Sequence, residues 1–390
     1  MISSFIKFKL IKMCISPLSK DSLSNMNNFK YKSTDASIMY NKCMSPCLNY
    51  FVNFLPRWLA PNLITFISLC FNIIAAVVSF IDGGFDFSQE LKPSTCIIIG
   101  VFQLIYLLLD NIDGKQARRT GNSTPFGMLM DHGCDVFTNI FTAYNLSKLA
   151  LVGNEDLYSF SVFFGLILGF YMMTYEEYKL GEMHFPPING TDEGNLFVFL
   201  FGVACGIFGQ DFLLYTLNEK LSFTVAKVVQ LGVVAGGVSC IFNLYIHTYK
   251  KKGFKEMIKI FLDNCTFYSV VIVPIYFIIF KLDFYIDYKW IILCNSCMIF
   301  ARVTIDIQIK ILTMDSLGCN YMIFFSNIIY IFSVTIPSAS IKYYVLLILF
   351  ICQTLELCAF IYIRAKEITK YLNIRIFCVS NAPQIISTTN

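Results

Sequence analysis

Long apolar segments of similar length recur along most of this 390-residue chain, and no other feature limits its possible folds as strongly. A helix of about 20 apolar residues is long enough to cross the hydrocarbon core of a bilayer, which is about 30 Å thick. Segments of this length lie at residues 62–81, 95–112, 132–152, 158–178, 195–216, 222–247, 259–280, 289–308, 320–338 and 341–363. We therefore predict an all-α integral membrane protein with about ten transmembrane helices.

The composition agrees with a chain that lies mostly in lipid. Apolar residues make up 56% of the sequence and charged residues 14%, whereas soluble domains carry about 25% charged residues. The net charge of +4 is small for 390 residues and gives no reason to expect a nucleic-acid partner. The 15 cysteines are scattered without the spacing of a zinc site, and the three histidines are too few for a histidine-rich metal site.

The two ends of the chain differ from its apolar part. Residues 1–45 are rich in Ser, Asn and Lys, and we expect a disordered, basic N-terminal tail. Residues 46–59 carry aromatic side chains before Pro61 and are expected to form an amphipathic helix in the membrane interface. The membrane domain is predicted to cover residues 46–370, and residues 371–390 are predicted to form a C-terminal cytosolic tail.

Basic residues are distributed unevenly between the two sets of loops. If the N-terminus is cytosolic, the loops after the even-numbered segments are cytosolic as well, whereas the opposite loops are acidic or thinly charged. The former loops carry Lys115, Arg118, Arg119, Lys250, Lys251, Lys252, Lys255, Lys259, Lys310, Arg364, Lys366 and Lys370. Because cytosolic loops of membrane proteins are enriched in Lys and Arg, we predict that both termini face the cytosol.

Four aspartates lie where the second and third apolar segments meet in a hairpin. The spacing i, i+3, i+4 and i+7 places residues on one face of a helix, and this face holds Asp110, Asp113, Gly114 and Ala117. The next helix carries, at i, i+4 and i+8, Gly127, Asp131 and Asp135. Four like charges in a low-dielectric pocket repel each other unless cations lie between them or some carboxyls are protonated. Since Mg²⁺ and Mn²⁺ prefer oxygen ligands, the pattern favours a site for a pair of such ions.

The same stretch carries a family pattern. The run D-x2-D-G-x2-A-R-x8-G-x3-D-x3-D, from Asp110 to Asp135, resembles the motif of the CDP-alcohol phosphotransferase family, with every fixed position filled. The runs at residues 58–65, 113–125 and 131–135 resemble the eukaryotic choline/ethanolamine phosphotransferase branch of that family. The likeness covers roughly residues 45–370, with the catalytic motif at residues 110–135.

The resemblance implies a membrane enzyme that moves a phospho-alcohol from a cytidine diphosphate carrier to a second alcohol. The metal ligands it implies are Asp110, Asp113, Asp131 and Asp135, which would hold two Mg²⁺ or Mn²⁺ ions. The nucleotide and substrate contacts it implies are Asn62, Gly114, Ala117, Arg118 and Gly127. Simpler roles stay open for these residues, namely helix capping, close packing of helices through small residues, and a positive-inside anchor.

His132 is the candidate general base, because the pKa of a histidine lies near neutrality. Asp135, one turn further along the helix, is the alternative base. The choline/ethanolamine branch usually carries Glu where this chain has Met128, at i−4 from His132. We therefore expect a slower enzyme, or one in which another carboxylate orients His132, either Glu176 or Glu177.

Three residues of the fourth apolar segment, Tyr175, Glu176 and Glu177, are candidates for binding the amine of the alcohol. Aromatic rings beside carboxylates hold ammonium groups through cation–π contacts and ion pairing. Tyrosines near the end of a span also anchor helices at the membrane interface. Both interpretations are compatible with the sequence.

The resemblance to the choline/ethanolamine branch implies a particular reaction. CDP-ethanolamine or CDP-choline would react with diacylglycerol to give CMP and phosphatidylethanolamine or phosphatidylcholine. The resemblance also implies a homodimer in the endoplasmic reticulum membrane, and the uneven distribution of basic residues predicts that the acidic site opens to the cytosol. The rival interpretations are a phosphotransferase for another alcohol, such as inositol or glycerol phosphate, and a non-catalytic paralogue or transporter, for which Met128 is the best support.

Overall fold

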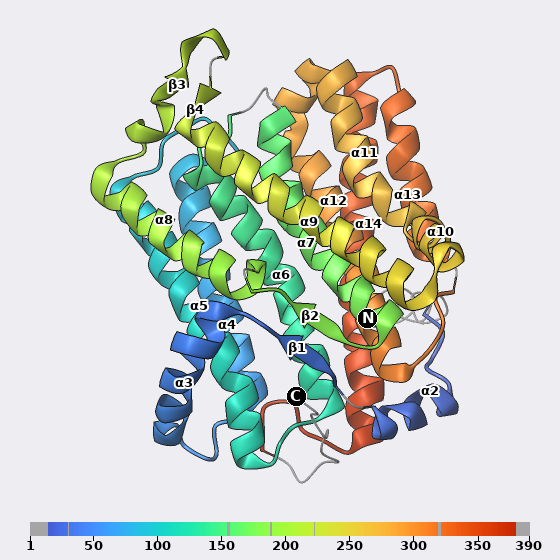
Figure 1. Ribbon diagram of the computed structural model, residues 1–390. Helices are drawn as coiled ribbons and strands as arrows, with labels where there is room; N and C mark the ends of the chain where they lie inside the picture. The colour runs from blue at the N-terminus through green and yellow to red at the C-terminus, as the bar shows by residue number, and fades with distance from the viewer. Residues whose placement is uncertain are drawn as a thin grey trace, which may run out of the picture.

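A computed structural model describes residues 15–29, 31–153, 157–187, 189–221, 223–318 and 321–379. Its long elements are α-helices that lie side by side (Figure 1). They are α4 (Pro61–Gly83), α5 (Pro93–Thr120), α6 (Pro125–Leu149), α7 (Leu157–Leu180), α8 (Asn195–Phe208), α9 (Val225–Lys252), α10 (Phe254–Asp263), α11 (Cys265–Phe280), α12 (Leu282–Thr313), α13 (Tyr321–Phe332) and α14 (Ala339–Leu372). Every apolar segment predicted from the sequence overlaps one of these helices, which agrees with the predicted all-α class.

Six stretches of helix in the described chain are long and apolar enough to cross a membrane, and the bent pair of α10 and α11 would make a seventh. The six are α4, α5, α8 with the turn before it (Gly190–Phe208), α9, α12 and α14. An all-α membrane protein therefore accounts for the structure. The number of crossings, about ten, stays a prediction.

Several short elements precede α4, and the strands of the described chain pair in two small sheets. Before α4 come α2 (Lys20–Asn25), η1 (Met26–Asn28), β1 (Ser33–Asp35), η2 (Tyr40–Met44), α3 (Ser45–Phe51) and η3 (Val52–Phe54). Strand β1 pairs in parallel with β2 (Met183–Phe185), with Thr34 opposite His184. Strand β3 (Thr216–Asn218) pairs antiparallel with β4 (Phe223–Thr224).

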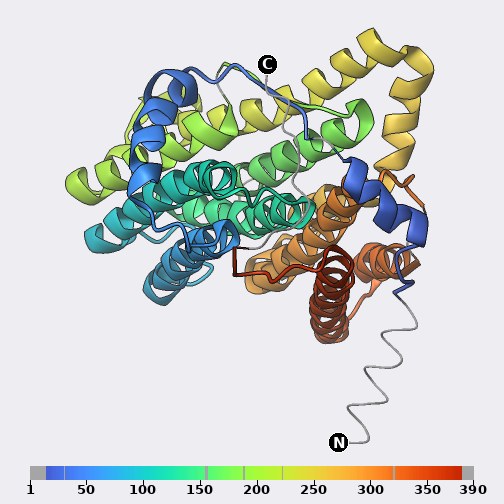
Figure 2. The same cartoon turned by 90° about the horizontal axis from the view of Figure 1, so that it is seen from below.

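The helices form two groups that share a buried seam. Helix α5 packs on α4 and α8, whereas α12 packs on α11 and α14, and α6 and α7 contact α12 between the two groups. Figures 1 and 2 show this arrangement from two sides. The side chains of Val136 on α6, Ile167 on α7 and Phe300 on α12 have no exposed surface. Helix α6 therefore lies inside the molecule. Helix α5, which precedes it in the sequence, runs in the opposite direction.

Close approach of helices through glycine explains part of this packing. A Cβ atom added at Gly202 of α8 would lie 2.9 Å from the backbone of Gly100 and of Cys96 in α5. A Cβ atom added at Gly237 of α9 would lie 2.5 Å from the carbonyl oxygen of Gly165 in α7. Small residues allow such contacts in membrane proteins, where packing rather than exclusion from water holds helices together.

A charged group joins α12 to α14 inside the bundle. Arg302 Nε donates to both carboxylate oxygens of Glu356, at 2.9 and 3.0 Å, and its guanidinium lies 3.4 Å from the ring centre of Phe360. Asp306 also pairs with Arg302, at 3.4 Å. Charges within membrane segments are expensive unless they are paired, so this group fixes the position of α14 against α12.

The expectation of disorder does not describe the part of residues 1–45 that the structure places. Met26, which is 1% exposed, packs with Phe126, Ile368 and Leu372. The side chain of Asn25 donates to the Thr313 carbonyl (2.8 Å). Apolar contacts and long-range hydrogen bonds of this kind leave no trace in the composition of a Ser/Asn/Lys-rich segment. Residues 1–14, the basic start of the expected tail, lie outside the described chain, as do residues 380–390.

Residues 31–39, which we call the N-terminal strap, cross one face of the bundle (blue in Figures 1 and 2). β1 holds the strap on β2, and the buried Ser37 hydroxyl donates to Glu193 Oε1 (2.8 Å). The Met39 N–H donates to the same oxygen (3.0 Å). After the strap, α3 exposes Tyr50 and Phe51, and η3 exposes Phe54. The location of this segment in the membrane interface stays a prediction.

The glycine contact between α5 and α8 gives a prediction about stability. Gly202→Ala would place a methyl group 2.9 Å from backbone atoms of α5, so the helices must separate, and overpacking of this kind costs about 1–3 kcal/mol. The control is Gly232→Ala, because nothing lies within 4 Å of a Cβ atom there. Thermal unfolding in detergent should show a lower midpoint for Gly202→Ala and no decrease for Gly232→Ala. Equal midpoints for both variants would contradict the packing role.

Candidate active site

The acidic motif forms a helical hairpin. Helix α5 ends at Thr120 and is capped by Gly121, whose φ of 65° is a left-handed conformation that favours glycine. Helix α6 then starts with Pro125 in its first turn, and the Thr124 side chain accepts a hydrogen bond from the Gly127 N–H (2.9 Å). These end signals are local, and they reverse the chain within four residues. The acidic faces of the two helices consequently meet.

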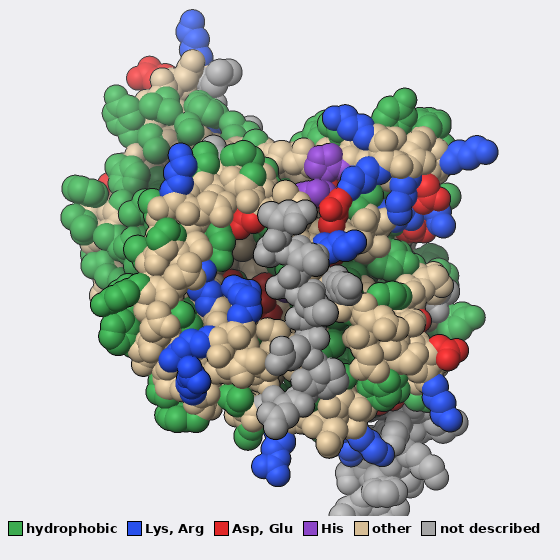
Figure 3. All heavy atoms as spheres, turned by 60° about the horizontal axis from the view of Figure 1, so that its bottom comes forward, with side chains coloured by type: hydrophobic (Ala, Val, Ile, Leu, Met, Phe, Trp, Pro, Cys, Tyr) green, Lys and Arg blue, Asp and Glu red, His purple; other side chains and the backbone are tan. Residues whose placement is uncertain are grey.

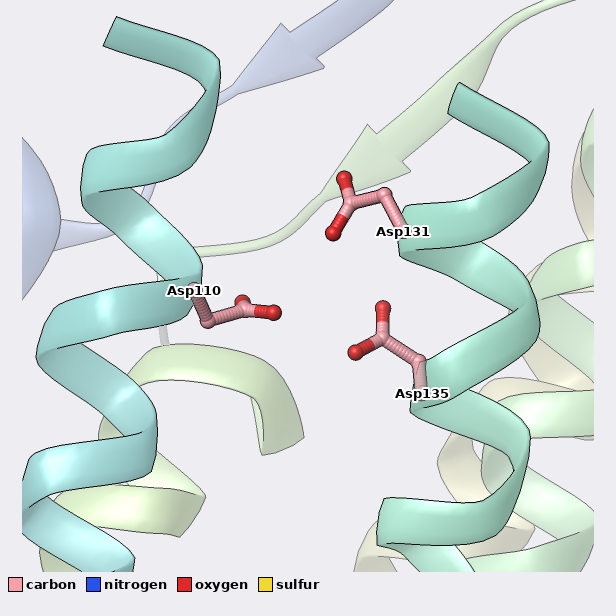
Figure 4. Close-up of side chains that lie close together, drawn as sticks. All are labelled: Asp110, Asp131 and Asp135. Atoms are coloured by element: carbon pink, nitrogen blue, oxygen red, sulfur yellow. The ribbon is translucent and has the colours of Figure 1, made fainter. Parts of the chain in front are cut away.

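Three of the four predicted aspartates come together. Asp110 projects from α5 toward Asp131 and Asp135 on α6 (Figure 4), and one oxygen of each carboxylate lies within 4.8 Å of the other two. Among the described residues, Asp110 Oδ1 and Asp131 Oδ1 have no hydrogen-bond partner although both are buried. Asp135 accepts a hydrogen bond from the Tyr106 hydroxyl (2.9 Å). Crowded, unpartnered carboxylate oxygens fit the ligand preference of Mg²⁺ or Mn²⁺.

The fourth aspartate, Asp113, lies outside this group of three. It is 5% exposed and accepts a hydrogen bond from the Thr65 hydroxyl of α4. Asp113 and Asp131 both border the same cavity. Asp113 therefore lines the cavity beside Asp131 but does not belong to the group formed by Asp110, Asp131 and Asp135.

That cavity has a volume of about 180 Å³ and opens beside the hairpin. All five predicted nucleotide and substrate residues line it, together with Asp113, Asp131 and His132; the five are Asn62, Gly114, Ala117, Arg118 and Gly127. The space-filling view of this face shows acidic and basic side chains side by side in a hollow (Figure 3). The structure thus collects on one surface residues from α4, α5 and α6.

The two glycines of the cavity differ in their surroundings. A Cβ atom added at Gly127 would lie 3.2 Å from Thr124 Oγ1 and 3.3 Å from Asn62 Oδ1. At Gly114 the nearest such contact is Arg118 Nη1, at an ordinary 3.6 Å. Gly127 therefore serves the close packing of α6 on the start of α4. Gly114 leaves open space on the cavity wall, as required where a ligand approaches the helix backbone.

His132 lies at the inner side of the cavity with two notable neighbours. Its Nδ1 atom is 4.0 Å from Glu177 Oε2 on α7, and this oxygen is buried without a hydrogen-bond partner in the described chain. The ring of Tyr31, from the N-terminal strap, meets the His132 ring edge-on with 5.8 Å between centres. Met128 lines the cavity one turn before His132. Glu177 of α7 therefore provides a carboxylate near His132, where the motif of this chain has Met128 instead of a glutamate.

The three predicted amine-binding residues do not form one pocket. Tyr175 donates its hydroxyl hydrogen to Asp263 Oδ2 (2.8 Å), and Glu176 Oε1 lies 2.6 Å from His247 Nδ1. Both side chains thus contact α9 and α10 rather than the cavity. Glu177 alone faces His132, because consecutive residues of a helix point about 100° apart.

Several residues of the site were not singled out by the sequence. Tyr106 lies at i−4 from Asp110 on the same face of α5, so helical spacing alone could have suggested it. Gln308 of α12, whose amide donates to the His132 carbonyl (2.9 Å), carries no local signal. Tyr31 carries none either, because its strap reaches the cavity only in the folded chain. Burial, and next the charge of Glu177, raise the pKa of the Tyr31 phenol, so this group stays neutral.

Lys115 has a structural role. Its Nζ atom donates to Ser45 Oγ (3.0 Å) and Asn49 Oδ1 (2.9 Å) and thereby holds α3 on α5. Arg118, three residues later, lines the cavity with Asp113. Arg118 therefore offers a guanidinium group to an anion in the cavity. A single guanidinium can donate hydrogen bonds to two oxygens of the same phosphate.

Comparison with known proteins agrees with this site. Residues 58–180, which run from just before α4 to the end of α7, match the family model described as CDP-alcohol phosphatidyltransferase. A CDP-alcohol phosphatidyltransferase class-I family protein of Dictyostelium discoideum is 33% identical over 237 residues, which cover 60% of this chain and 55% of that protein. Cholinephosphotransferase 1 of Gallus gallus is 32% identical over 234 residues, covering 59% and 67% respectively.

Choline/ethanolaminephosphotransferase 1 of Arabidopsis thaliana is 28% identical over 200 residues, which are 50% of this chain and 49% of the plant protein. The chain thus spans about half the length of several curated relatives that it matches. The matched segment contains both helices of the acidic hairpin and all the residues that line the cavity except Tyr31. The protein belongs to the CDP-alcohol phosphatidyltransferase family.

Proposed function

We propose that this protein transfers phosphoethanolamine or phosphocholine from CDP-ethanolamine or CDP-choline to diacylglycerol, releasing CMP. The observation that carries the proposal is the three-carboxylate group, whose member Asp131 lines the same cavity as Arg118 and His132. The names of the choline and ethanolamine relatives support the choice of amine alcohols. A cationic alcohol linked to a diphosphate also matches a cavity that mixes carboxylates with a guanidinium.

We assign the metal site to Asp110, Asp131 and Asp135, with Asp113 as a further ligand beside them. The unpartnered oxygens of Asp110 and Asp131 are the features that fit a pair of Mg²⁺ or Mn²⁺ ions. When bound, such ions withdraw charge from the phosphorus under attack and stabilise the leaving phosphate. Tyr106 orients Asp135 and Thr65 orients Asp113 by their hydrogen bonds, so the ligands need little rearrangement.

We assign the nucleotide and diphosphate side of the cavity to Asn62, Gly114, Ala117, Arg118 and Gly127. The Nδ2 atom of Asn62 donates to the Ile376 carbonyl (2.8 Å), so Oδ1 is the atom it offers to a ligand. The small side chains of Gly114 and Ala117 allow the ligand to approach the backbone of α5 closely, and Arg118 pairs with phosphate oxygens. These roles place the CDP moiety across the ends of α4, α5 and α6.

We assign the proton transfer to His132. Its Nδ1 atom faces Glu177, which leaves Nε2 to accept the proton of the acceptor hydroxyl as that oxygen attacks phosphorus. Glu177 orients the ring and stabilises its protonated form, as carboxylates do for histidine bases. Asp135 is better suited to hold metal than to act as the base, because its oxygen already accepts from Tyr106.

The cellular setting completes the proposal. Diacylglycerol would enter laterally from the bilayer, and the CDP-alcohol from the cytosol, because the basic residues predict a cytosolic hairpin. We further propose about ten membrane crossings, a homodimer and an endoplasmic reticulum location.

The first prediction concerns the reaction itself. Purified protein in detergent, given CDP-choline or CDP-ethanolamine, diacylglycerol and Mg²⁺, should release CMP. Asp131→Asn should lower the rate by at least about 100-fold, because it removes a charged ligand at the reacting phosphorus. The control is Asp283→Asn, an exposed aspartate at the start of α12, which should keep the wild-type rate. Full turnover by Asp131→Asn would disprove the mechanism, and transport without CMP release would favour a non-catalytic relative.

The second prediction separates the two adjacent glutamates of α7. Glu177→Gln should reduce kcat by about 10–100-fold with little change in KM for the CDP-alcohol, since loss of an orienting partner has effects of this size. Glu176→Gln removes a neighbouring carboxylate that pairs with His247, and its effect on kcat should be much smaller. If both variants lose the same activity, the Glu177 carboxylate has no specific role at His132.

The third prediction concerns position 128, where this chain has Met and the choline/ethanolamine branch usually has Glu. Met128→Glu alone should change kcat little, because Glu177 already faces His132. In a Glu177→Gln background, however, Met128→Glu should restore part of the lost kcat by supplying a carboxylate one turn from the histidine. Steady-state rates of the two single variants and the double variant form the required cycle. A double variant no faster than Glu177→Gln would show that the two positions are not interchangeable.

A further inference from the structure

The N-terminal strap reaches the cavity from outside the segment that defines the family. It is fixed directly after Tyr31, because the Lys32 carbonyl accepts from the Met183 N–H (3.1 Å) and the Ala36 N–H donates to the Phe185 carbonyl (3.0 Å). Ser37 and Met39 then bind Glu193. Such a strap holds one side chain at a constant position rather than covering the cavity loosely.

That side chain is Tyr31. Its hydroxyl is directed at Met183 Sδ (3.9 Å), so Tyr31 offers its ring to the cavity rather than its hydroxyl. Apart from the imidazole of His132, no other aromatic ring belongs to the described residues that line this cavity. A carboxylate lies close by as well, because Glu177 Oε2 is 4.0 Å from Nδ1 of the same His132 ring that Tyr31 contacts.

The cavity has two ends with different chemistry. Asn62 Oδ1 lies beside Gly127 at one end of the cavity. His132 follows Gly127 by five residues on α6, which corresponds to about 7.5 Å along the helix axis. If the nucleotide occupies the end near Asn62 and Arg118, the diphosphate extends toward Asp131. The alcohol attached to the second phosphate then reaches His132 and Tyr31.

We propose that Tyr31 is a specificity-determining residue whose ring binds the ammonium group of the transferred alcohol by a cation–π contact. The inference rests on the proposed function and adds to it the residue that recognises the amine. Aromatic faces bind quaternary ammonium groups well, because methylated ammonium is weakly hydrated and spreads its charge over a large surface. Tyr31 therefore takes the place that the sequence assigned to Tyr175, which is bonded to Asp263 instead.

The test is binding of CDP-choline, CDP-ethanolamine and CMP to the purified full-length protein by calorimetry, with Mn²⁺ present and no acceptor lipid. Tyr31→Leu should weaken CDP-choline binding about tenfold and CDP-ethanolamine binding less, while CMP binding stays within about twofold, because CMP has no amine. Tyr31→Phe keeps the ring and should bind all three ligands like the wild type. Thermal unfolding of each variant shows whether the fold is retained.

Tyr40→Leu is the matched control, since it removes a ring from the same N-terminal region that lies near Lys115 and not in the cavity; it should change none of the three affinities. Equal weakening of CMP and CDP-choline by Tyr31→Leu, or no weakening at all, would overturn the role of the ring while leaving the proposed reaction intact. A wild-type protein that binds neither CMP nor CDP-choline would instead refute the proposed function, and this inference with it.

Discussion

Mutual repulsion of three aspartates inside a helical membrane protein is the constraint on which the rest of the site depends. Their carboxylates lie within 4.8 Å of one another, and two of their buried oxygens lack a partner in the described chain. Unpaired buried charge is costly, so a fold would not retain this arrangement without a ligand that compensates it. Divalent cations would supply that compensation, because Mg²⁺ and Mn²⁺ prefer carboxylate oxygens as ligands.

The architecture keeps this repulsion from opening the hairpin. Gly121 and Thr124 end one helix and begin the next within a few residues, while the close contact of Gly127 with Asn62 locks α6 against α4. Tyr106 and Thr65 each donate to a carboxylate. The acidic faces are therefore held in place by apolar packing and neutral hydrogen bonds, which leaves their remaining oxygens for ligands. The family relationship, which spans α4 to α7, covers this same set of helices.

Local sequence signals predict the helices and the hairpin, and they fail for contacts made across the fold. The spacing of Asp110, Asp131 and Asp135 on two helix faces is enough to predict their meeting, and the small residues near them predict the cavity. The sequence predicts that either Glu176 or Glu177 lies beside His132. Only the orientation of α7 in the folded chain shows that Glu177 faces His132, whereas Glu176 pairs with His247. Tyr31 and Gln308 belong to segments far from the motif in sequence, so no periodicity or motif indicates them. The docking of residues 15–29 and 31–45 on the bundle was missed for the same reason, because the bonds of Asn25 to Thr313 and of Ser37 to Glu193 are long-range.

The most direct test of the account is an anomalous scattering map of crystals grown with Mn²⁺ and CDP-choline. The account predicts manganese peaks at the carboxylates of Asp110, Asp131 and Asp135, with Asp113 beside them and the diphosphate bound to the same ions. Peaks confined to other places, with the nucleotide bound away from the hairpin, would contradict it.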